Sequence, residues 1–481
     1  MTVLNKASVK EAEKKAVKSG IFSFTELMGI AGKAAAQKIM MAYDIKGKKI
    51  AVVCGKGNNG GDGFVCADTL RKEATVDVII PFGEPETDDA RHYFNALSGV
   101  GVLSTLKGDY DIVIDALFGI GLNRPLSCDA VALIEKINSM NCIKIAIDIP
   151  SGVEADSGAV MGAAVMADMT VTFIALKPCF LLPEGSDYCG KVEVADIGVK
   201  PHKADYYLIE KPNFTDRRHN AHKGDFGTAL MICGSYGMCG AAIFAARGAL
   251  RSGVGILKAV ICDSIYSPFT AAVPEAVCIP VKTGESGTAD SDDNRIYEHI
   301  SSSKALLIGC GMGNNEDTLK ILEKIIKKAD CPIVIDADGI NALCQCINII
   351  REAKKEIILT PHPGEMARLC GVTTAEVEKD RIYYASKTAK DLNVILVLKG
   401  ANTIVALPDG KIFFNTTGNP GMATGGSGDV LAGITVSLLA QGITCEEAVK
   451  SAVYIHGAAG DLAAKQFGEM GMLPSDIINN L

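Results

Sequence analysis

The chain has 481 residues, with 48% hydrophobic and 22% charged side chains, 50 glycines and no tryptophan. This mixture excludes a wholly disordered chain, a coiled coil and a fibre, and the length predicts about two or three domains. The net charge of −8 argues against a nucleic-acid surface, and Arg247 and Arg251 interrupt the most apolar run, so no membrane span is expected.

The first half alternates short β-branched runs with helical patterns. After two N-terminal helical stretches, strands are predicted in KKIAVVCG, TVDVIIPFG, DIVIDALFG and KIAIDIPSG, with a helix in GFVCADTLRKE. Strands separated by helices predict a right-handed, mostly parallel sheet. Each strand ends in a loop rich in Gly, Asp or Ser, and ligands bind at the carboxyl ends of such strands. We therefore expect the functional residues there.

A glycine-rich loop follows the first of these strands. Its segment GKGNNG at 55–60 fits the G-x-G-x-x-G pattern, which suits a phosphate at a helix start. The next strand runs into Pro81 and offers no carboxylate for a ribose, which disfavours a dinucleotide-binding dehydrogenase. The longer string GKGNNGGDGFV is more specific, because Asn58, Asn59 and Asp62 add amide and carboxylate groups to the loop. An ordinary glycine-rich turn is the alternative.

Oxygen donors end two further strands of the same sheet. Asp115 ends IVIDA, and Asp148 with Ser151 closes IAIDIPSGV, so both positions share a sheet edge with Asn59. Carboxylate, amide and hydroxyl oxygens suit an alkali or alkaline-earth cation and not zinc. The alternative is that each aspartate only caps its following turn.

The stretch from Lys200 to His222 carries many charges and little periodicity, so a domain boundary is predicted near Lys211, between domains 1–210 and 211–481. A second alternating series follows. It comprises TALMICGS, an Ala-rich helix from Gly240 to Arg251, and strands in GVGILKAVI, ALLIGCGMG, PIVIDADG, EIILTPHPGE, VILVLKG and TIVALPDG.

The strongest signal in the second half is NTTGNPGMATGGSGDVLAGI. No GxxxxGK segment ending in Ser or Thr exists, so a P-loop is not supported. Gly425, Gly426 and Gly428 instead free the backbone N–H groups at a helix start to form an anion hole for a phosphoryl group. Asp429 follows at once and can take the proton of a substrate hydroxyl. A helix N-cap aspartate is the alternative.

Two other segments are candidates for binding. The segment LKGANT at 398–403 could present Lys399 and backbone groups to a nucleotide, and His362 lies at a strand end in TPHPGE. A lone histidine is usually structural, although the PHPGE setting favours a functional one. His456 lies on an Ala-rich helix and is predicted to pack in the core.

Six motifs follow one another over nearly all of residues 1–210: LMGIAG, GKGNNGGDGFV, DALFGIGLNRP, DIPSGV, ADMTVTF and GKVEVADIGV. By these motifs and their order, the first half resembles the epimerase domain of the NAD(P)H-hydrate repair enzymes, with Gly29 where the family usually has a larger polar residue. The resemblance implies a Rossmann-like three-layer αβα domain, with Asp148 at the reacting ring. It also implies a potassium ion held by Asn59, Asp115 and Ser151. The hydrated nucleotide would be bound by Asn58, Asn59, Gly60, Gly61, Asp62, Gly119, Ile120, Gly121, Leu122, Asn123, Arg124 and Pro125.

The second half is similar to the ribokinase-like ADP- or ATP-dependent NAD(P)H-hydrate dehydratase domain of the same family. The match runs over about residues 215–481 through HKGDFG, GSYGMCGAA, VIDADGINAL, TPHPGE, KGANT and GGSGDVLAG. Cys310 stands where the family commonly has proline. The resemblance implies an αβα domain that uses ADP, with Mg²⁺, as phosphoryl donor. It implies hydrate contacts from Ala241, Gly311, His362 and Asp429, and nucleotide contacts from Lys399, Gly400, Ala401, Asn402, Thr403 and Gly428.

Both halves then indicate one substrate, NADH or NADPH whose nicotinamide ring has gained water at C6. The first domain would interconvert the R and S hydrates, and the second would phosphorylate the C6 hydroxyl of the S form so that phosphate leaves and NAD(P)H is restored. Two alternatives stay open. One is a ribokinase-like small-alcohol kinase fused to a non-catalytic nucleotide-binding domain, and the other is a hydride-transferring Rossmann dehydrogenase.

Cysteine usage bears on the compartment. The 16 cysteines are scattered singly from Cys54 to Cys445 without a CxxC pair, and charged residues interrupt the first twenty positions. This pattern favours reduced thiols over disulfides or a zinc ribbon, and disfavours a secretory signal. We expect a cytoplasmic homo-oligomer that binds small molecules and neither nucleic acid nor membrane.

Overall fold

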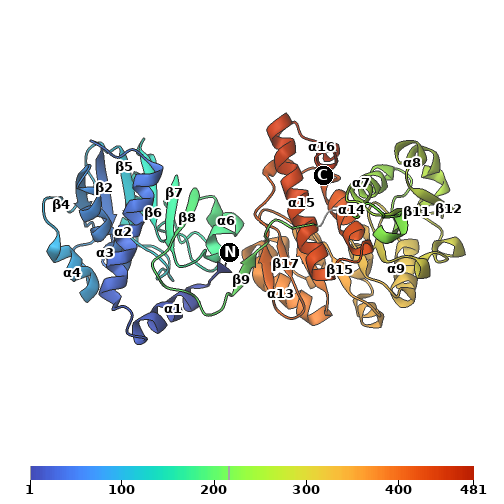
Figure 1. Cartoon of the computed structure of the whole chain (residues 1–481), viewed down its shortest axis with the longest axis horizontal. Helices are drawn as coiled ribbons and strands as arrows, with labels where there is room; N and C mark the ends of the chain where they lie inside the picture. Colours follow the sequence, from blue (N-terminus) through green and yellow to red (C-terminus); the bar gives the residue numbers. More distant parts are fainter. Residues whose placement is uncertain (1, 215–216) are drawn as a thin grey trace. The chain divides into compact units, whose positions relative to one another are not determined.

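The computed structural model describes residues 2–214 and 217–481. The chain divides into two compact units, Met1–Tyr207 and Leu208–Leu481, each with a large sheet (Figure 1). The division follows Tyr207, whereas the sequence places the boundary after residue 210. Among the described residues, no helix combines the length and the apolar character that crossing a membrane requires.

The first unit contains a parallel sheet in the order β4-β3-β2-β5-β6-β7-β8. Its strands are β2 (Lys49–Cys54), β3 (Thr75–Ile79), β4 (Gly101–Leu103), β5 (Ile112–Ala116), β6 (Ile143–Ile147), β7 (Met169–Phe173) and β8 (Lys191–Ala195). Its helices are α1 (Lys6–Lys18), α2 (Phe24–Ala42), α3 (Asn58–Leu70), α4 (Asp88–Ala96), α5 (Cys128–Ser139) and α6 (Pro183–Ser186). A short strand β1 (Thr2–Val3) pairs antiparallel with β9 (Tyr206–Leu208).

Strand β2 explains the layers of this unit, because successive residues face opposite sides of a sheet. Ile50 and Val52 pack in a core with residues of α2 and α3, whereas Ala51 and Val53 pack in another core with Ile134 of α5. The unit is therefore a three-layer αβα sandwich.

The second unit contains strands in the order β18-β17-β16-β15-β14-β13-β10-β11-β12, in which β17 pairs antiparallel with β16 and β18 and the other pairs are parallel. These are β10 (Thr228–Ile232), β11 (Ile256–Cys262), β12 (Val277–Val281), β13 (Ala305–Ile308), β14 (Ile333–Ile335), β15 (Ile357–Leu359), β16 (Ile395–Leu398), β17 (Ile404–Ala406) and β18 (Ile412–Phe414). Every residue of β13 to β16 is buried, as helices on both faces of a sheet require.

The helices of the second unit include α14, which packs on β10, β13 and β14 and makes a broad contact with α7. They are α7 (Cys239–Arg251), α8 (Tyr266–Ala272), α9 (Glu316–Lys328), α10 (Asp338–Leu343), α11 (Pro363–Cys370), α12 (Thr374–Lys379), α13 (Arg381–Leu392), α14 (Ser427–Ala440), α15 (Cys445–Phe467) and α16 (Pro474–Asn479).

The α/β class predicted for both halves is confirmed, as are the predicted strands and the Ala-rich helix, which begins one residue earlier, at Cys239. The sequence analysis named no strand for β1, β4, β7, β8, β9 or β12, and it also missed β18. This strand follows β17 through a turn in which the Gly410 N–H donates to the Leu407 carbonyl at 3.0 Å, with Gly410 at a φ of 92°.

Candidate active sites

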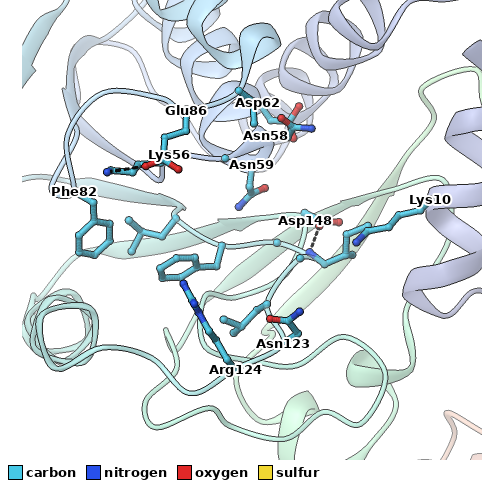
Figure 2. A pocket seen from close by; sticks show the side chains of 18 of the residues that line it. Lys10, Lys56, Asn58, Asn59, Asp62, Phe82, Glu86, Asn123, Arg124 and Asp148 are labelled. Carbon is cyan, nitrogen blue, oxygen red and sulfur yellow. Dashed lines mark hydrogen bonds and ion pairs between the residues drawn. The ribbon is translucent and has the colours of Figure 1, made fainter.

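The carboxyl ends of β2, β3, β5 and β6 surround a cavity of about 1080 Å³ in the first unit (Figure 2). Parallel strands bring their following loops to one edge of a sheet, which is why distant segments meet here. Figure 2 shows Asn59 and Asp148 at this cavity, with Lys10 reaching in from α1. The predicted residues that line it are Asn58, Asn59, Asp62, Gly119, Ile120, Gly121, Leu122, Asn123, Arg124 and Asp148.

Three predicted binding residues, Gly60, Gly61 and Pro125, are not among those that line the cavity. The two glycines are needed for packing. A Cβ on Gly60 would collide with the Gly55 carbonyl oxygen, and one on Gly61 would collide with the sulfur of Met28. Both glycines therefore let α3 begin close to its neighbours.

Asp115 lies fully buried at the end of β5, and both of its carboxylate oxygens accept hydrogen bonds. Oδ2 accepts from the Ser151 N–H at 2.7 Å, and Oδ1 accepts from the Ser151 hydroxyl at 2.6 Å and the Leu117 N–H at 3.1 Å. The Ser151 oxygen accepts from the Phe118 N–H at 2.9 Å. Burial nevertheless raises the pKa of Asp115 to about 6. The carboxylate thus caps its turn and has no cationic side chain beside it among the described residues.

The Asn59 side chain indicates whether Asn59, Asp115 and Ser151 together fit a cation. Its Oδ1 and Nδ2 are both buried and have no hydrogen-bond partner within the protein. A Cβ on Gly119 would lie 3.3 Å from Asn59 Oδ1, so Asn59 lies beside the loop that contains Phe118. An unpaired buried amide costs about 1–3 kcal/mol, which a ligand would recover. Amide, carboxylate and hydroxyl oxygens together fit a hard cation.

Asp148 is held by a lysine that the sequence analysis missed. Its Oδ1 accepts from Lys177 Nζ at 2.9 Å, and its Oδ2 accepts from the Ile120 N–H at 2.9 Å. Lys177 Nζ also donates to Thr172 Oγ1 at 2.5 Å and to the Phe173 carbonyl at 3.0 Å, which uses all three of its protons. The Asp148 backbone adopts a φ of 68°, a strained conformation for a residue with a Cβ. Lys177 thereby orients a carboxylate that lines the cavity.

In the second unit, the glycine-rich segment begins α14, as predicted. Gly426 is the N-cap residue, with a φ of 101° that a side chain would disfavour. Asp429 lies in the first turn, where burial, followed by the charge of Asp336, raises its pKa to about 7. A Cβ on Gly428 would lie 3.2 Å from Lys399 Nζ. The free N–H groups of the helix start and an ammonium therefore lie close together, as an anion site requires.

Lys399 is paired with Asp336, to which the sequence analysis assigned no role. Its Nζ donates to Asp336 Oδ1 at 2.7 Å and lies 3.8 Å from Glu365 Oε2. Burial lowers the pKa of Lys399, but Asp336 and Glu365 outweigh burial and the pKa is raised. The Thr360 hydroxyl donates to the same Asp336 oxygen at 2.7 Å, and the Cys310 thiol lies 3.7 Å from the other. Asp336 therefore fixes the ammonium beside the start of α14.

The segment at 399–403 forms a turn with Gly400 at a φ of 138° and Asn402 at 50°. Thr403 donates its hydroxyl to the Gly400 carbonyl at 3.1 Å. The buried Arg381 donates to the Lys399 carbonyl at 3.1 Å and thereby supports the turn. Arg381 was also missed, because its partner lies 18 residues further along the chain.

The remaining predicted hydrate contacts are Ala241, Gly311 and His362. A Cβ on Gly311 would lie 2.7 Å from the Ala241 Cβ, so these two residues are neighbours. His362 caps α11 by accepting from the Gly364 N–H at 3.0 Å, and burial, then Lys399, lowers its pKa.

His456 is buried, as predicted, and lies 3.2 Å from the Ser427 hydroxyl at the start of α14. Burial lowers the pKa of His456 to about 4, so the ring is neutral near pH 7.

Comparisons with known proteins cover both units. A family model described as YjeF-related protein N-terminus matches residues 25–179, and one described as NAD(P)H-hydrate dehydratase matches residues 229–481. A protein of Thermofilum pendens named bifunctional NAD(P)H-hydrate repair enzyme Nnr is 36% identical over 490 residues, which cover 98% of this chain and 92% of its own. The protein of that name from Escherichia coli is 33% identical, with coverage of 100% and 93%.

A solved structure matches part of the chain. The ADP/ATP-dependent NAD(P)H-hydrate dehydratase from Bacillus subtilis, co-crystallised with ATP and Mg²⁺, is 32% identical and covers 56% of this chain and 91% of that chain, with a TM-score of 0.48. The near full-length relatives and the two family models agree with the motifs in both halves. The chain therefore belongs to the family of bifunctional NAD(P)H-hydrate repair enzymes.

Proposed function

We propose that the first unit interconverts the R and S hydrates of NADH and NADPH, and that the second unit returns the S hydrate to NAD(P)H at the expense of ADP. The observation that carries this proposal is the presence of both family matches in one chain, each on a unit with charged side chains at its strand ends. The same matches favour hydrate repair over a small-alcohol kinase fused to a non-catalytic nucleotide-binding domain.

One experiment tests both activities. The protein, ADP and Mg²⁺ are added to a mixture of R and S hydrates, and the absorbance band of the reduced nicotinamide is followed. Full recovery of the band requires both activities. Recovery of only the S fraction would contradict the epimerase assignment, and no recovery would contradict the dehydratase assignment.

In the first unit, Asn58, Asp62 and the 119–125 loop would bind the hydrate, with Asp148 at the reacting ring. No side chain caps the start of α3, whose N-cap residue is Gly57, so the backbone N–H groups there can bind the substrate phosphates. A potassium ion would be held by the Asn59 amide oxygen, the Asp115 carboxylate and the Ser151 hydroxyl. When bound, such a cation neutralises the buried carboxylate and orders the loop next to the phosphates.

Replacing Asp115 by alanine should weaken hydrate binding and slow epimerisation, because it removes the cation and the hydrogen bonds that tie Ser151 to β5. Epimerisation by the wild type should also depend on potassium. The measurement is the rate of R-to-S conversion with potassium or with tetramethylammonium, together with the KM for hydrate.

Dehydration by the same preparation serves as the control for Asp115→Ala, since the second unit folds around its own sheet. Potassium-independent epimerisation, together with an Asp115→Ala variant as active as the wild type, would contradict the cation site.

In the second unit, Asp429 would take the proton of the C6 hydroxyl as its oxygen attacks the β-phosphorus of ADP. The N–H groups at the start of α14 and the Lys399 ammonium would stabilise the charge on the transferring group. AMP leaves first. Phosphate then departs with the C6–O electron pair while N1 supplies electrons, and loss of a proton from C5 restores the dihydronicotinamide.

Hydrate contacts would come from Ala241, Gly311 and His362, and the turn at 399–403 with Gly428 would hold the nucleotide. Mg²⁺ would accompany the nucleotide, because it prefers phosphate and carboxylate oxygens, and Asp336 provides a carboxylate there. When bound, Mg²⁺ neutralises charge on the phosphates.

ADP should therefore support turnover and release one AMP and one phosphate for each NAD(P)H formed. A lysine, backbone N–H groups and a glycine-rich helix start can hold a diphosphate without a P-loop. Chromatography of the nucleotides beside the absorbance assay measures this ratio. Turnover with ATP alone, with ADP acting as an inhibitor, would contradict the assignment of the donor.

A further inference from the structure

Helix α1 forms part of the wall of the first cavity, to which it contributes Val9, Lys10 and Glu13. The start of the helix is anchored to the rest of the unit, since Lys6 Nζ lies 2.6 Å from Glu154 Oε1 and the Glu154 carboxylate is largely buried. The helix lies outside the segment that the family model matches, residues 25–179. No site residue was predicted from it.

Five carboxyl groups line this cavity. Those of Glu86 and Asp129 are exposed, and the other three belong to Asp148 after β6, Asp62 on α3 and Glu13 on α1. Asp148 is bound to Lys177, whose three protons are all donated within the protein. Glu13 has no hydrogen bond or ion pair in the part of the chain that the structure describes. Its carboxyl group is therefore available to a bound ligand.

The surroundings favour the protonated form of two of these carboxyl groups. Burial raises the pKa of Glu13, and Asp148 raises it further, whereas Lys177 and Lys10 lower it. Burial, then Asp148 and Glu13, raises the pKa of Asp62 well above its usual value, and Lys177 opposes this. The Asp148 carboxylate in the same cavity is instead bound to the Lys177 ammonium. Two carboxyl groups in different surroundings can serve as the acid and the base of one site.

We propose that Glu13 is a catalytic residue of the epimerase site. It exchanges a proton with the C6 oxygen on one face of the ring, while Asp148 exchanges a proton with the oxygen that binds C6 on the other face. The proposal rests on the epimerase activity proposed above. Glu13 is the better candidate than Asp62 for this role because it comes from a separate wall of the cavity, whereas Asp62 lies on α3 with Asn58, and both already have a proposed role in binding the hydrate.

The configuration at C6 then inverts in two steps. Glu13 gives its proton to the C6 hydroxyl, the C6–O bond breaks with its electron pair leaving in water, and the N1 lone pair forms a second C6–N1 bond. Water then adds to the other face of C6, N1 recovers its electron pair, and Asp148 takes the proton that the water loses. Proton exchange with solvent then returns Glu13 to its protonated form and Asp148 to its carboxylate form. The product therefore has the same composition as the substrate. In the reverse direction the two residues exchange roles.

The test compares Glu13→Gln and Glu13→Asp with a matched control, Glu11→Gln. Glu11 lies on the same helix, but it is exposed and paired with Lys15 at 2.7 Å. The rate of R-to-S conversion is measured between pH 5 and pH 9 in the full chain, with kcat and KM for the hydrate determined separately. Dehydration of the S hydrate by each preparation reports on the second unit, and Tm reports on folding.

We expect Glu13→Gln to lower the kcat of epimerisation by about 10²-fold or more, with KM within about threefold of the wild type. Glu13 must be protonated to act as the acid, so the epimerisation rate of the wild type should decrease as the pH rises through the raised pKa of Glu13. The Glu13→Gln variant should not show this decrease. Glu13→Asp should restore part of the kcat. Glu11→Gln should match the wild type.

Three results would overturn the proposal. The first is a Glu13→Gln variant with a kcat and pH profile like those of the wild type. The second is a rise in KM with kcat unchanged, which would show that Glu13 only binds substrate. The third is an equal loss in Glu13→Gln and Glu13→Asp with a lowered Tm, which would show a structural role. A wild-type protein that does not epimerise would instead refute the proposed activity of the first unit itself, and is distinguished by the wild-type assay alone.

Discussion

Replacing Asp429 by asparagine should lower the kcat of dehydration by about 10²–10⁴-fold, the loss typical when a general base is removed. Asparagine keeps the shape of the side chain but cannot accept the proton of the C6 hydroxyl. Epimerisation should be unchanged, because Asp429 lies in the second unit and the epimerase cavity is formed by the first. Single-turnover dehydration of the pure S hydrate with ADP measures the loss without interference from epimerisation.

The pH dependence gives a second measure of the role of Asp429. Burial and Asp336 raise its pKa to about 7, and a base acts only when it is deprotonated. The kcat/KM of wild-type dehydration should therefore rise as the pH increases through about 7. Asp429→Asn should lack this rise.

Asp391→Asn is the control for Asp429→Asn, since Asp391 is exposed and paired with Lys387 at 3.2 Å. It should leave dehydration unchanged. An Asp429→Asn variant that retains most of the dehydration rate, with the same pH profile as the wild type, would contradict the assignment of Asp429 as the base.

The sequence was sufficient to place the candidate residues near strand ends and at helix starts, because strand ends and glycine-rich helix starts are local features. Asn59 lies at the start of α3, Asp115 lies near the end of β5 and Ser151 lies in the loop after β6, and the parallel sheet brings them to one edge. Asp429 was located in the same way, from the glycines that precede it. Alternation of apolar runs with helical patterns was likewise enough for most strands of the two sheets.

The partners of these residues could not be predicted from the sequence. Lys177 follows β7 as an isolated lysine, and its pairing with Asp148, 29 residues earlier, depends on how β6 and β7 lie side by side. Asp336 and Lys399 are 63 residues apart and meet only when β14, β15 and β16 align. Glu13 belongs to a helix whose apolar pattern says nothing about which face reaches the cavity.

The structure shows the local capping roles that were weighed as alternatives from the sequence. Asp115 does cap its turn, through Ser151 and Leu117, yet the unpaired amide of Asn59 lies in the same region. His362 caps α11 and at the same time lies near the buried ammonium of Lys399. A local structural role thus does not exclude a role in binding, because the turn that a side chain stabilises is itself part of the site.

Replacing Lys177 by methionine should lower the free energy of unfolding of the first unit by about 3–5 kcal/mol, because removing one partner of a buried ion pair leaves the other charge uncompensated. The Lys177 side chain is 1% exposed and that of Asp148 is 12% exposed, so water cannot replace the ammonium fully. Epimerisation should fall as well, since Asp148 loses its main orienting contact. Hydrogen exchange of the β6 and β7 amides at increasing urea concentrations measures the stability of this unit within the full chain.

Two further variants separate the charge of Lys177 from its packing. Lys191→Met removes an exposed lysine that pairs with Glu193 at 2.9 Å, and it should change stability little because water screens such pairs. Asp148→Asn combined with Lys177→Met should be more stable than Lys177→Met alone, since asparagine leaves no buried charge without a partner. If the double variant is as unstable as the single one, the loss comes from the contacts to Thr172 and Phe173 instead, and Lys177 acts on the fold of β7 more than on Asp148. A Lys177→Met variant with the stability of the wild type would contradict the prediction, because it would mean that the Asp148 carboxylate needs no cation at this strand end.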